Sequence, residues 1–269
     1  MSEVVLYEVE DRIATVTLNR PERLNAINPE LDEALIAALL RAEADPDVRC
    51  AIVQGAGRAF CAGADTKRDD SSGQPRDFTP IEDRNRLEAQ YRRWMQIWDL
   101  KIPVIAKVHG YCLGRGTQLA VICDITYVAE DTIIGAPQLP LGAGWNSVFW
   151  AWHLGPKKAK EIFLPVGDTI TGAEAAELGI FNAALPADQL DAHVAEYARK
   201  LARVPKDLLG LEKLAINKTQ DIQGFREALA VGFEIDVIGH LAPAVLDVNR
   251  RIREDGLRPT IEAWQAGEF

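Results

Sequence analysis

The chain has 269 residues, of which 48% are hydrophobic, and 40 acidic side chains against 30 basic ones give a formal net charge of −10. This balance argues against a nucleic-acid-binding surface, because neutralising phosphates requires clustered lysines and arginines. Even the Trp-rich stretch 144–154 is interrupted by polar residues and falls short of the roughly 20 apolar residues of a membrane span. We therefore expect neither a nucleic acid nor a membrane as partner.

The N-terminal residues and the cysteines indicate the cell compartment. Residues 1–12 are charged and strand-like and match neither a secretory signal nor a transit peptide, so we expect a cytoplasmic protein. Cys50, Cys61, Cys112 and Cys123 lie in apolar stretches without a CxxC pair, which predicts reduced, buried thiols. The histidines show no HxxxH or HExxH spacing, so we expect no metal site.

The first half of the chain alternates predicted strands and helices. Alternating and β-branched residues predict a hairpin at 4–9 and 13–18, and apolar residues at helical spacing predict a helix from Pro29 to the Asp45-Pro46 stop. The further predicted elements are strand 48–54, helix 81–100, strand 103–108, helix 114–123 and strands 125–128 and 132–135. Short strands that alternate with helices predict a layered α/β core of parallel β turns.

The second half is predicted to be almost entirely helical. The predicted helices cover 145–153, 157–164, 173–178, 187–203, 206–217, 224–239 and 244–254. The polar stretch 68–79 predicts an exposed loop. We expect an α/β core over residues 1–200 and a helical segment over residues 201–269.

Two glycine-rich turns are the candidate sites for chemistry. Small residues crowd together in 57–65, directly after a buried strand, so the backbone there can approach a ligand and leave N–H groups unpaired. The second turn, 109–116, follows strand 103–108 and opens a helix, whose N-terminus could stabilise a developing oxyanion. Taken singly, each turn is more often no more than a tight turn.

The order and surroundings of the two turns resemble those of the crotonase (enoyl-CoA hydratase/isomerase) superfamily. The resemblance rests on NRPERLNA at 19–26, AFCAGAD at 59–65, the strand-turn-helix 102–124, GPKKAKE at 155–161, TGAEAAELGI at 171–180 and EDG at 254–256. It implies a crotonase-like ββα-superhelix core, an acyl-coenzyme A thioester as substrate and no prosthetic group. It also implies that segment 201–269 contributes to a homotrimer or a dimer of trimers.

The resemblance assigns roles to individual residues. The two oxyanion donors would be the backbone N–H groups of Ala64 and Arg115, and many members have glycine where this chain has arginine. The side chain of Arg115 must therefore fit without filling the pocket. The residues implied to border coenzyme A or the substrate are Arg23, Leu24, Ala62, Ala64, Asp65, Thr66 and Trp145. For Asp65, a carboxylate that bonds N–H groups of its own turn is the simpler interpretation.

Two amides mark a departure from the family pattern. Hydratase members carry glutamates at the positions of Gln118 and Gln138, where the pair activates and protonates across a bound water. An amide neither gives nor takes a proton near neutral pH, so we expect hydration by a glutamate pair to be absent or very slow. Gln118 and Gln138 could still orient water or bond a substrate oxygen, or could merely satisfy buried polar groups.

Other residues extend or limit this hypothesis. The tryptophans at 94, 98, 145, 150 and 152, with Phe149, belong to segments that the family places around the acyl group, although four-residue spacing is first of all core packing. They suggest a bulky, cyclic or aromatic acyl group. We expect His109 to be structural, and Glu234, Asp236 and His240 to serve an interface or the edge of the core.

Two functions remain open. The first is an enzyme that forms a thioester enolate and performs isomerase, lyase or C–C hydrolase chemistry. The second is a catalytically silent acyl-CoA-binding protein or assembly subunit that kept the pocket and lost both carboxylates.

Overall fold

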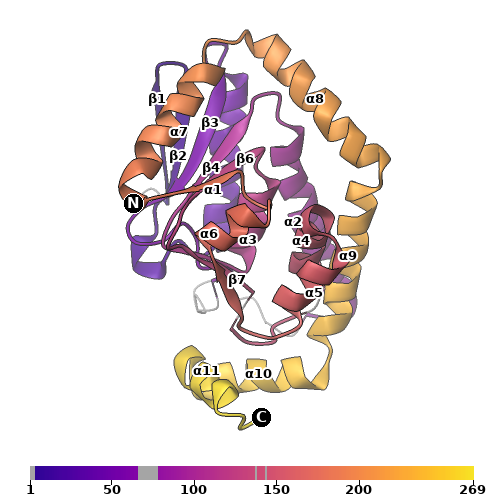
Figure 1. The fold of residues 1–269 in the computed structure, drawn as a ribbon. Helices are drawn as coiled ribbons and strands as arrows, with labels where there is room; N and C mark the ends of the chain where they lie inside the picture. The colour runs from indigo at the N-terminus through magenta and orange to yellow at the C-terminus, as the bar shows by residue number, and fades with distance from the viewer. Residues whose placement is uncertain (1–3, 66–77, 137, 143) are drawn as a thin grey trace.

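The computed structural model describes residues 4–65, 78–136, 138–142 and 144–269. A six-stranded sheet in the order β1-β2-β3-β4-β6-β9 forms its centre (Figure 1). The strands are β1 (Val5–Glu10), β2 (Ile13–Leu18), β3 (Cys50–Gly55), β4 (Val104–Val108), β6 (Ile125–Ala129) and β9 (Ala183–Leu185). The first two strands form the predicted antiparallel hairpin, with Glu10 opposite Ile13, and the remaining pairs are parallel.

A second, three-stranded sheet lies beside the first. Its strands β5 (Tyr111–Leu113), β7 (Ile133–Gly135) and β8 (Thr169–Thr171) run in the order β5-β7-β8. The strands β5, β8 and β9 were not predicted, because three residues are too few to show an alternating pattern. Tertiary pairing creates them: β5 pairs with β7, β8 with β7, and β9 with β6.

The helices begin where the sequence provides caps. The Asn28 side chain accepts a hydrogen bond from the Leu31 N–H at the start of α1 (Pro29–Ala44). Thr79 and Glu82 form a capping box at the start of α2 (Pro80–Asp99). The other helices are the 3-10 turn η1 (Pro21–Arg23), α3 (Arg115–Ile122), α4 (Trp145–Leu154), α5 (Pro156–Phe163), α6 (Gly172–Glu177), α7 (Ala187–Leu201), α8 (Lys206–Ile222), α9 (Phe225–His240), α10 (Pro243–Glu254) and α11 (Leu257–Gln265).

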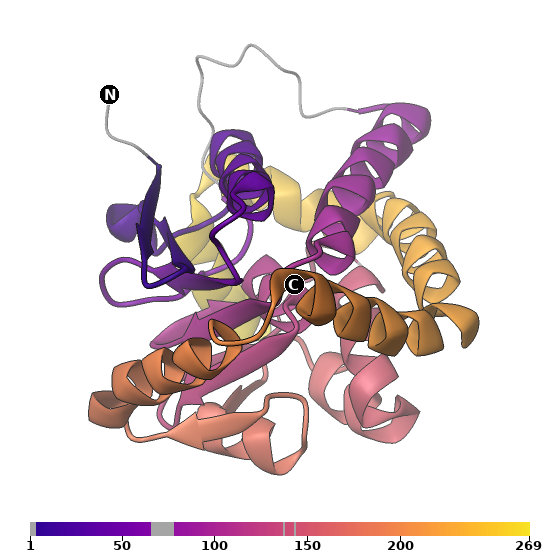
Figure 2. The ribbon, with the colours of Figure 1, turned by 90° about the horizontal axis from the view of Figure 1, so that it is seen from above.

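The central strands β3, β4 and β6 are largely buried on both faces, which agrees with the predicted α/β class. Cys50 and Ile52 of β3 pack with Leu190 and Val194 of α7, whereas Val53 faces a larger cluster that includes residues of α1, α2 and α4. Figure 2 shows α7 on one side of the sheet and α1 and α2 on the other. Parallel strands covered by helices on both faces need side chains that are apolar in almost every position, as in β3 and β4. The four cysteines are free and buried, as predicted.

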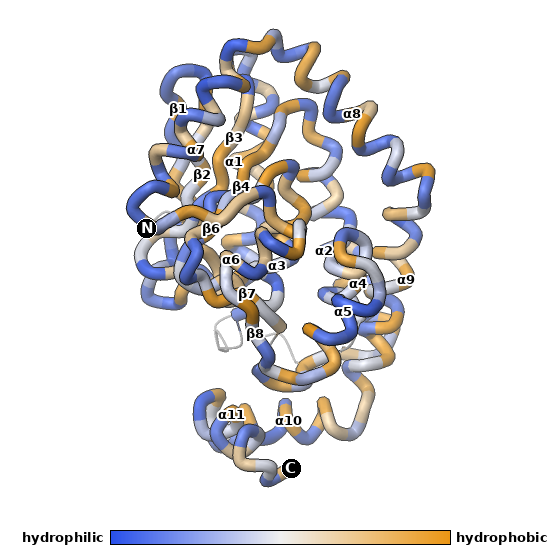
Figure 3. Tube along the Cα trace, viewed as in Figure 1, coloured by the Kyte–Doolittle hydropathy of each residue, from blue (hydrophilic) through white to orange (hydrophobic). Residues whose placement is uncertain are grey.

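The C-terminal helices follow the outside of this core. Figure 1 shows α8 and α9 along one side of the molecule and α10 and α11 beyond its lower end. Hydrophobic segments recur along α8 in Figure 3, and its exposed apolar side chains are Leu208, Leu211, Leu214, Ile216 and Ile222. The boundary between a core at 1–200 and a C-terminal segment at 201–269 stays a prediction.

Among the described residues, no single helix is both long and apolar enough to cross a membrane. The helices α9 and α10, bent by 68° relative to each other, reach that length and apolar composition only as a pair.

Candidate functional site

The two glycine-rich turns meet at an isolated parallel bridge between Cys61 and Cys112. The Cys61 N–H donates to the Tyr111 carbonyl oxygen and the Leu113 N–H donates to the Cys61 carbonyl oxygen, both at 3.0 Å. Gly116, in the first turn of α3, permits the close packing. A Cβ atom there would lie 3.1 Å from the carbonyl carbon of Cys61 and closer still to its oxygen.

The first turn leaves one N–H group without an acceptor. The Ile27 N–H donates to the Gly63 carbonyl oxygen at 2.7 Å, and the Asp65 N–H donates to the Ile27 carbonyl oxygen at 3.0 Å. In a parallel bridge these bonds occupy the peptides on either side of Ala64, so the Ala64 N–H points away from Ile27. Ala64 is exposed, and its N–H donates to no acceptor among the described residues.

The second turn offers another N–H group close by. Arg115 is the first residue of α3, where a backbone N–H has no intrahelical acceptor, and no other described residue accepts from it. A Cβ atom built on Gly63 would lie 3.7 Å from the Arg115 nitrogen, so the two turns are neighbours at this point. Two free donors, one of them at a helix N-terminus, can hold an oxygen that gains negative charge.

The Arg115 side chain leaves the turn toward a buried carboxylate. Its Nη2 lies 3.8 Å from an oxygen of Asp32, and its guanidinium carbon lies 5.4 Å from the centre of the Trp94 ring. Asp32 also accepts hydrogen bonds from Arg93 Nη1 and Trp94 Nε1, both at 2.7 Å. Burial lowers the pKa of Arg115 to about 10 and Asp32 opposes that effect, so the guanidinium stays charged at neutral pH.

The two amides occupy different environments. Gln118 lies in α3, one turn after Arg115, with only 2% of its surface exposed, and its Oε1 atom has no hydrogen-bond partner. A buried acceptor without a partner costs free energy, so a ligand or water that donates to it would be favoured. Gln138 is exposed, so the structure does not bury the two amides as a pair.

The residues expected to border coenzyme A surround the first turn. Arg23 and Leu24 lie in and after η1, and the Leu24 carbonyl oxygen accepts from the Ala62 N–H at 2.9 Å. The carboxylate of Asp65 forms an ion pair with Arg20 at 2.7 Å. This contact shows that the Asp65 carboxylate links the first turn to the segment between β2 and η1, rather than bonding only within its own turn. Thr66 lies outside the described residues.

Aromatic side chains fill the space between α2, α4 and α9. Trp145 is 4% exposed, lies edge-on to Phe233 with ring centres 6.3 Å apart, and its indole N–H has no partner. The Trp94 indole bonds Asp32, and Trp98 stacks against Phe225 at 4.6 Å. Packing therefore accounts for much of the aromatic clustering, while the buried indole N–H of Trp145 has no hydrogen-bond partner among the described residues.

A histidine between two carboxylates is the feature that the sequence did not reveal. His240, the last residue of α9, shares a 2.6 Å hydrogen bond through Nδ1 with Asp83 of α2, and its Nε2 lies 3.8 Å from Asp236. Burial opposes protonation, but the hydrogen bond to Asp83 and the charges of Asp236 and Asp83 outweigh it, so the pKa of His240 is raised. We expected Asp236 and His240 to serve an interface or the core edge, because they interrupt an otherwise apolar helical pattern. Their partner Asp83 is 157 residues away from His240 in the sequence, so no local pattern indicates the contact.

The remaining candidates have structural surroundings. His109 shares a 2.9 Å hydrogen bond with the Gly57 carbonyl oxygen and thereby connects the two turns, as a structural role requires. Glu234 pairs with Arg84 at 2.8 Å on the surface of α9. No group of three or more possible metal-ligating side chains occurs in the described part of the chain.

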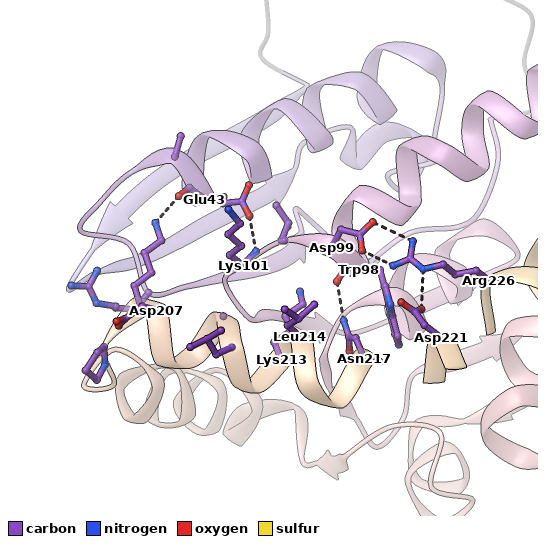
Figure 4. Close-up of a pocket in the computed structure, with 17 residues that line it drawn as sticks. Glu43, Trp98, Asp99, Lys101, Asp207, Lys213, Leu214, Asn217, Asp221 and Arg226 are labelled. Carbon is purple, nitrogen blue, oxygen red and sulfur yellow. Dashed lines mark hydrogen bonds and ion pairs between the residues drawn. The ribbon is translucent and has the colours of Figure 1, made fainter. Parts of the chain in front are cut away.

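A cavity of about 970 Å³ lies away from both turns, under α8. Figure 4 shows Lys213 and Asn217 of α8 pointing toward the end of α2, where the Asn217 amide donates to the Trp98 carbonyl oxygen at 2.9 Å. Lys213 Nζ is satisfied there by Asp124 at 2.8 Å and by two backbone carbonyl oxygens. Lys213 and Asn217 are thus engaged by protein groups, so this cavity lacks free donors like the backbone N–H groups of Ala64 and Arg115.

The fold and the paired turns define an α/β protein of the crotonase type. A family model described as enoyl-CoA hydratase/isomerase matches residues 8–236. The chain therefore belongs to the enoyl-CoA hydratase/isomerase family, within the crotonase superfamily. This membership supports the broad prediction of an acyl-CoA enzyme.

Individual relatives agree with this assignment over most of the chain. A Mycobacterium tuberculosis protein named as an enoyl-CoA hydratase, EchA13, is 37% identical in an alignment that covers 88% of this chain and 81% of that protein. The crystal structure of an enoyl-CoA hydratase/isomerase from Xanthobacter autotrophicus Py2 matches with a TM-score of 0.91 at 36% identity, over 100% of this chain and 99% of that one. An enoyl-CoA hydratase from Mycobacterium smegmatis matches with a TM-score of 0.86 at 32% identity, over 96% and 91% of the two chains.

Proposed function

We propose that the protein is an acyl-CoA-processing enzyme that stabilises a thioester enolate through the backbone N–H groups of Ala64 and Arg115. The observation that carries the proposal is the adjacency of these two donors, since neither has an acceptor among the described residues. A thioester carbonyl placed between them gains negative charge when the α-proton leaves, and preorganised donors stabilise that charge at no reorganisation cost. Coenzyme A enters as part of the substrate, and the proposal needs no prosthetic group.

The reaction we propose differs from hydration by a glutamate pair. Gln118 and Gln138 hold amides where such a pair would stand, and amides do not transfer protons near neutral pH. Isomerisation, C–C hydrolysis and lyase chemistry all begin with the same oxyanion and remain compatible with these side chains. In this proposal Gln118 uses its unpaired Oε1 to orient water or a substrate hydroxyl.

The proposed acyl group is bulky, cyclic or aromatic. Trp145 and Phe233 supply large flat surfaces between α4 and α9, and the unpaired indole N–H of Trp145 could bond an oxygen of the acyl group. Thermal-shift measurements with crotonyl-CoA, a long linear acyl-CoA and phenylacetyl-CoA test the idea. We expect the largest stabilisation from phenylacetyl-CoA, and strongest stabilisation by crotonyl-CoA would oppose it.

The second candidate, a silent acyl-CoA-binding protein, rests on the same two glutamines. The two candidates separate in deuterated water, where an enzyme that forms an enolate exchanges the α-protons of a bound acyl-CoA and a silent protein does not. The experiment incubates the protein with acetyl-, butyryl- and phenylacetyl-CoA and follows their masses. Thermal shift confirms binding in parallel. Binding without exchange or turnover would favour the silent protein.

The contacts with coenzyme A follow the family pattern in this proposal. Arg23 and Leu24 border the coenzyme, and Ala62, Asp65 and Thr66 contact its adenine and pantetheine. The carboxylate of Asp65 pairs with Arg20 and its N–H donates to the Ile27 carbonyl oxygen, and both contacts hold the first turn in place beside the proposed coenzyme site. Arg23→Ala should therefore weaken binding of free coenzyme A in isothermal titration, and unchanged affinity would remove Arg23 from the site.

We also propose self-association into a homotrimer or a dimer of trimers. Exposed apolar side chains recur along α8 and α9, including Leu211, Leu214 and Ile238, and such side chains are seldom left in water in this number on one face. Sedimentation velocity should give the mass of three or six chains of 29.6 kDa. A monomer at micromolar concentration would contradict the assembly.

A further inference from the structure

We propose that His240, held by Asp83, transfers the proton at the acyl end of the substrate. The inference rests on the proposed enolate chemistry and supplies the ionisable group that the two glutamines cannot. In the step we assign to it, the Cα–H bond of the acyl group breaks and the proton passes to Nε2 of His240. The electron pair moves into the thioester and places negative charge on the carbonyl oxygen. Return of the proton to carbon restores the imidazole.

The first observation is the geometry of the dyad. Asp83 accepts from Nδ1 of His240 at 2.6 Å, and the same carboxylate accepts from Arg86 at 3.0 Å, which fixes its orientation. A carboxylate that binds Nδ1 selects the imidazole tautomer and leaves Nε2 to act on a substrate. The His240 side chain is 26% exposed, so it remains accessible.

The second observation places the dyad against the segment that leads from Gln138 to Trp145, which the proposed function assigns to the acyl end of the site. A Cβ atom built on Gly142 would lie 3.0 Å from Nε2 of His240 and 2.5 Å from Oδ1 of Asp236. Gly142 belongs to the segment between Gln138 and Trp145, which joins the second amide to the aromatic wall.

The charged groups around the imidazole define its pH response. Asp83 and Arg86 face it from α2, and Asp236 faces it from its own helix, α9. The segment around Gly142 presents backbone, and the C-terminal end of α9 adds the negative end of the helix dipole. Two carboxylates against one guanidinium favour the imidazolium. The neutral base therefore forms only as the pH rises through the His240 pKa, which lies above its ordinary value.

The first experiment follows α-proton exchange of phenylacetyl-CoA in deuterated buffers of increasing pH. We expect the wild-type rate to rise with pH and then level off. His240→Gln should lower the plateau about 10²-fold or more and remove the rise, the usual effect of losing a general base. Asp83→Asn should move the midpoint to lower pH, because the imidazole loses a carboxylate that holds its proton. His193→Gln, on the outer helix α7, serves as the matched control and should leave the profile unchanged.

The results distinguish a failure of the role of His240 from a failure of the proposed function. Exchange by the wild type with an unchanged profile in His240→Gln would overturn the role of His240 and leave the proposed function standing. Binding of phenylacetyl-CoA by the wild type without any exchange would overturn both.

A second measurement is independent of turnover. Diethylpyrocarbonate modifies accessible imidazoles, and mass spectrometry locates the product. If His240 faces the acyl group, bound phenylacetyl-CoA should slow its modification several-fold and leave that of His193 unaffected. Equal modification of His240 with and without the thioester would contradict its position at the site.

Discussion

Gly116→Ala should separate the two turns that carry the oxyanion donors. The added Cβ atom would lie 3.1 Å from the carbonyl carbon of Cys61, whereas carbon atoms pack at about 3.5–4.0 Å. Because the Cβ atom would lie closer still to the carbonyl oxygen of Cys61, the turns must move apart by roughly 1 Å. A misplacement of about 1 Å can cost on the order of 10²-fold in rate, so we expect α-proton exchange to fall by about 10- to 100-fold. Mass spectrometry of phenylacetyl-CoA in deuterated water measures this rate.

Gly179→Ala is the matched control for this substitution. Gly179 has a φ of +78°, and a Cβ atom there would meet nothing within 4 Å. The control should lose roughly 1 kcal/mol of stability through backbone strain, yet keep the wild-type exchange rate. Gly116→Ala with a wild-type exchange rate would refute the reasoning that close packing of the turns positions the donors.

The remaining predictions concern stability and the two amides. Lys213→Met leaves Asp124 buried without its cation and should lower the free energy of unfolding by about 3–5 kcal/mol in urea titrations, and a loss below 1 kcal/mol would contradict a buried ion pair. The raised pKa of His240 should contribute stability that is fully present below its unfolded pKa of about 6.5 and is lost as the pH rises through the folded value. Urea midpoints between about pH 5.5 and 8.5 measure this loss, which His240→Asn should abolish. Wild-type protein should not hydrate crotonyl-CoA at a measurable rate, whereas Gln118→Glu with Gln138→Glu should introduce hydration, seen as loss of the enoyl absorbance. Rapid hydration by the wild type would refute the interpretation of the amides.

Local sequence patterns predicted the helices and strands whose start and end are set by residues within the segment itself. The hairpin of β1 and β2 follows from alternation, and α1 follows from apolar spacing with the Asn28 cap and the stop at Asp45-Pro46. Strands β8 and β9 could not be predicted, because pairing with distant strands produces each three-residue element. The 3-10 turn at η1 and the last helix, α11, were likewise not predicted.

Some features of the candidate site could likewise be predicted from the sequence, and others could not. The adjacency of Ala64 and Arg115 could be expected from the family resemblance, because the family's motifs occur in the same order in this chain. The same order of motifs implies the same fold, and that fold brings the two turns together. The position of the Arg115 side chain could not, since its carboxylate partner Asp32 lies in α1 and looks in the sequence like a helix-surface charge. The dyad of Asp83 and His240 was hidden for the same reason, because only tertiary packing brings α2 to the end of α9.

In the proposed site, two backbone N–H groups polarise the thioester carbonyl. Difference infrared spectroscopy with phenylacetyl-CoA labelled with ¹³C at the carbonyl carbon tests it most directly, because hydrogen bonding weakens the C=O bond and lowers its stretching frequency. We predict a shift to lower frequency on binding to the wild type and a smaller shift on binding to Gly116→Ala. A carbonyl frequency equal to that of the free thioester in water, with binding confirmed, would contradict the oxyanion site.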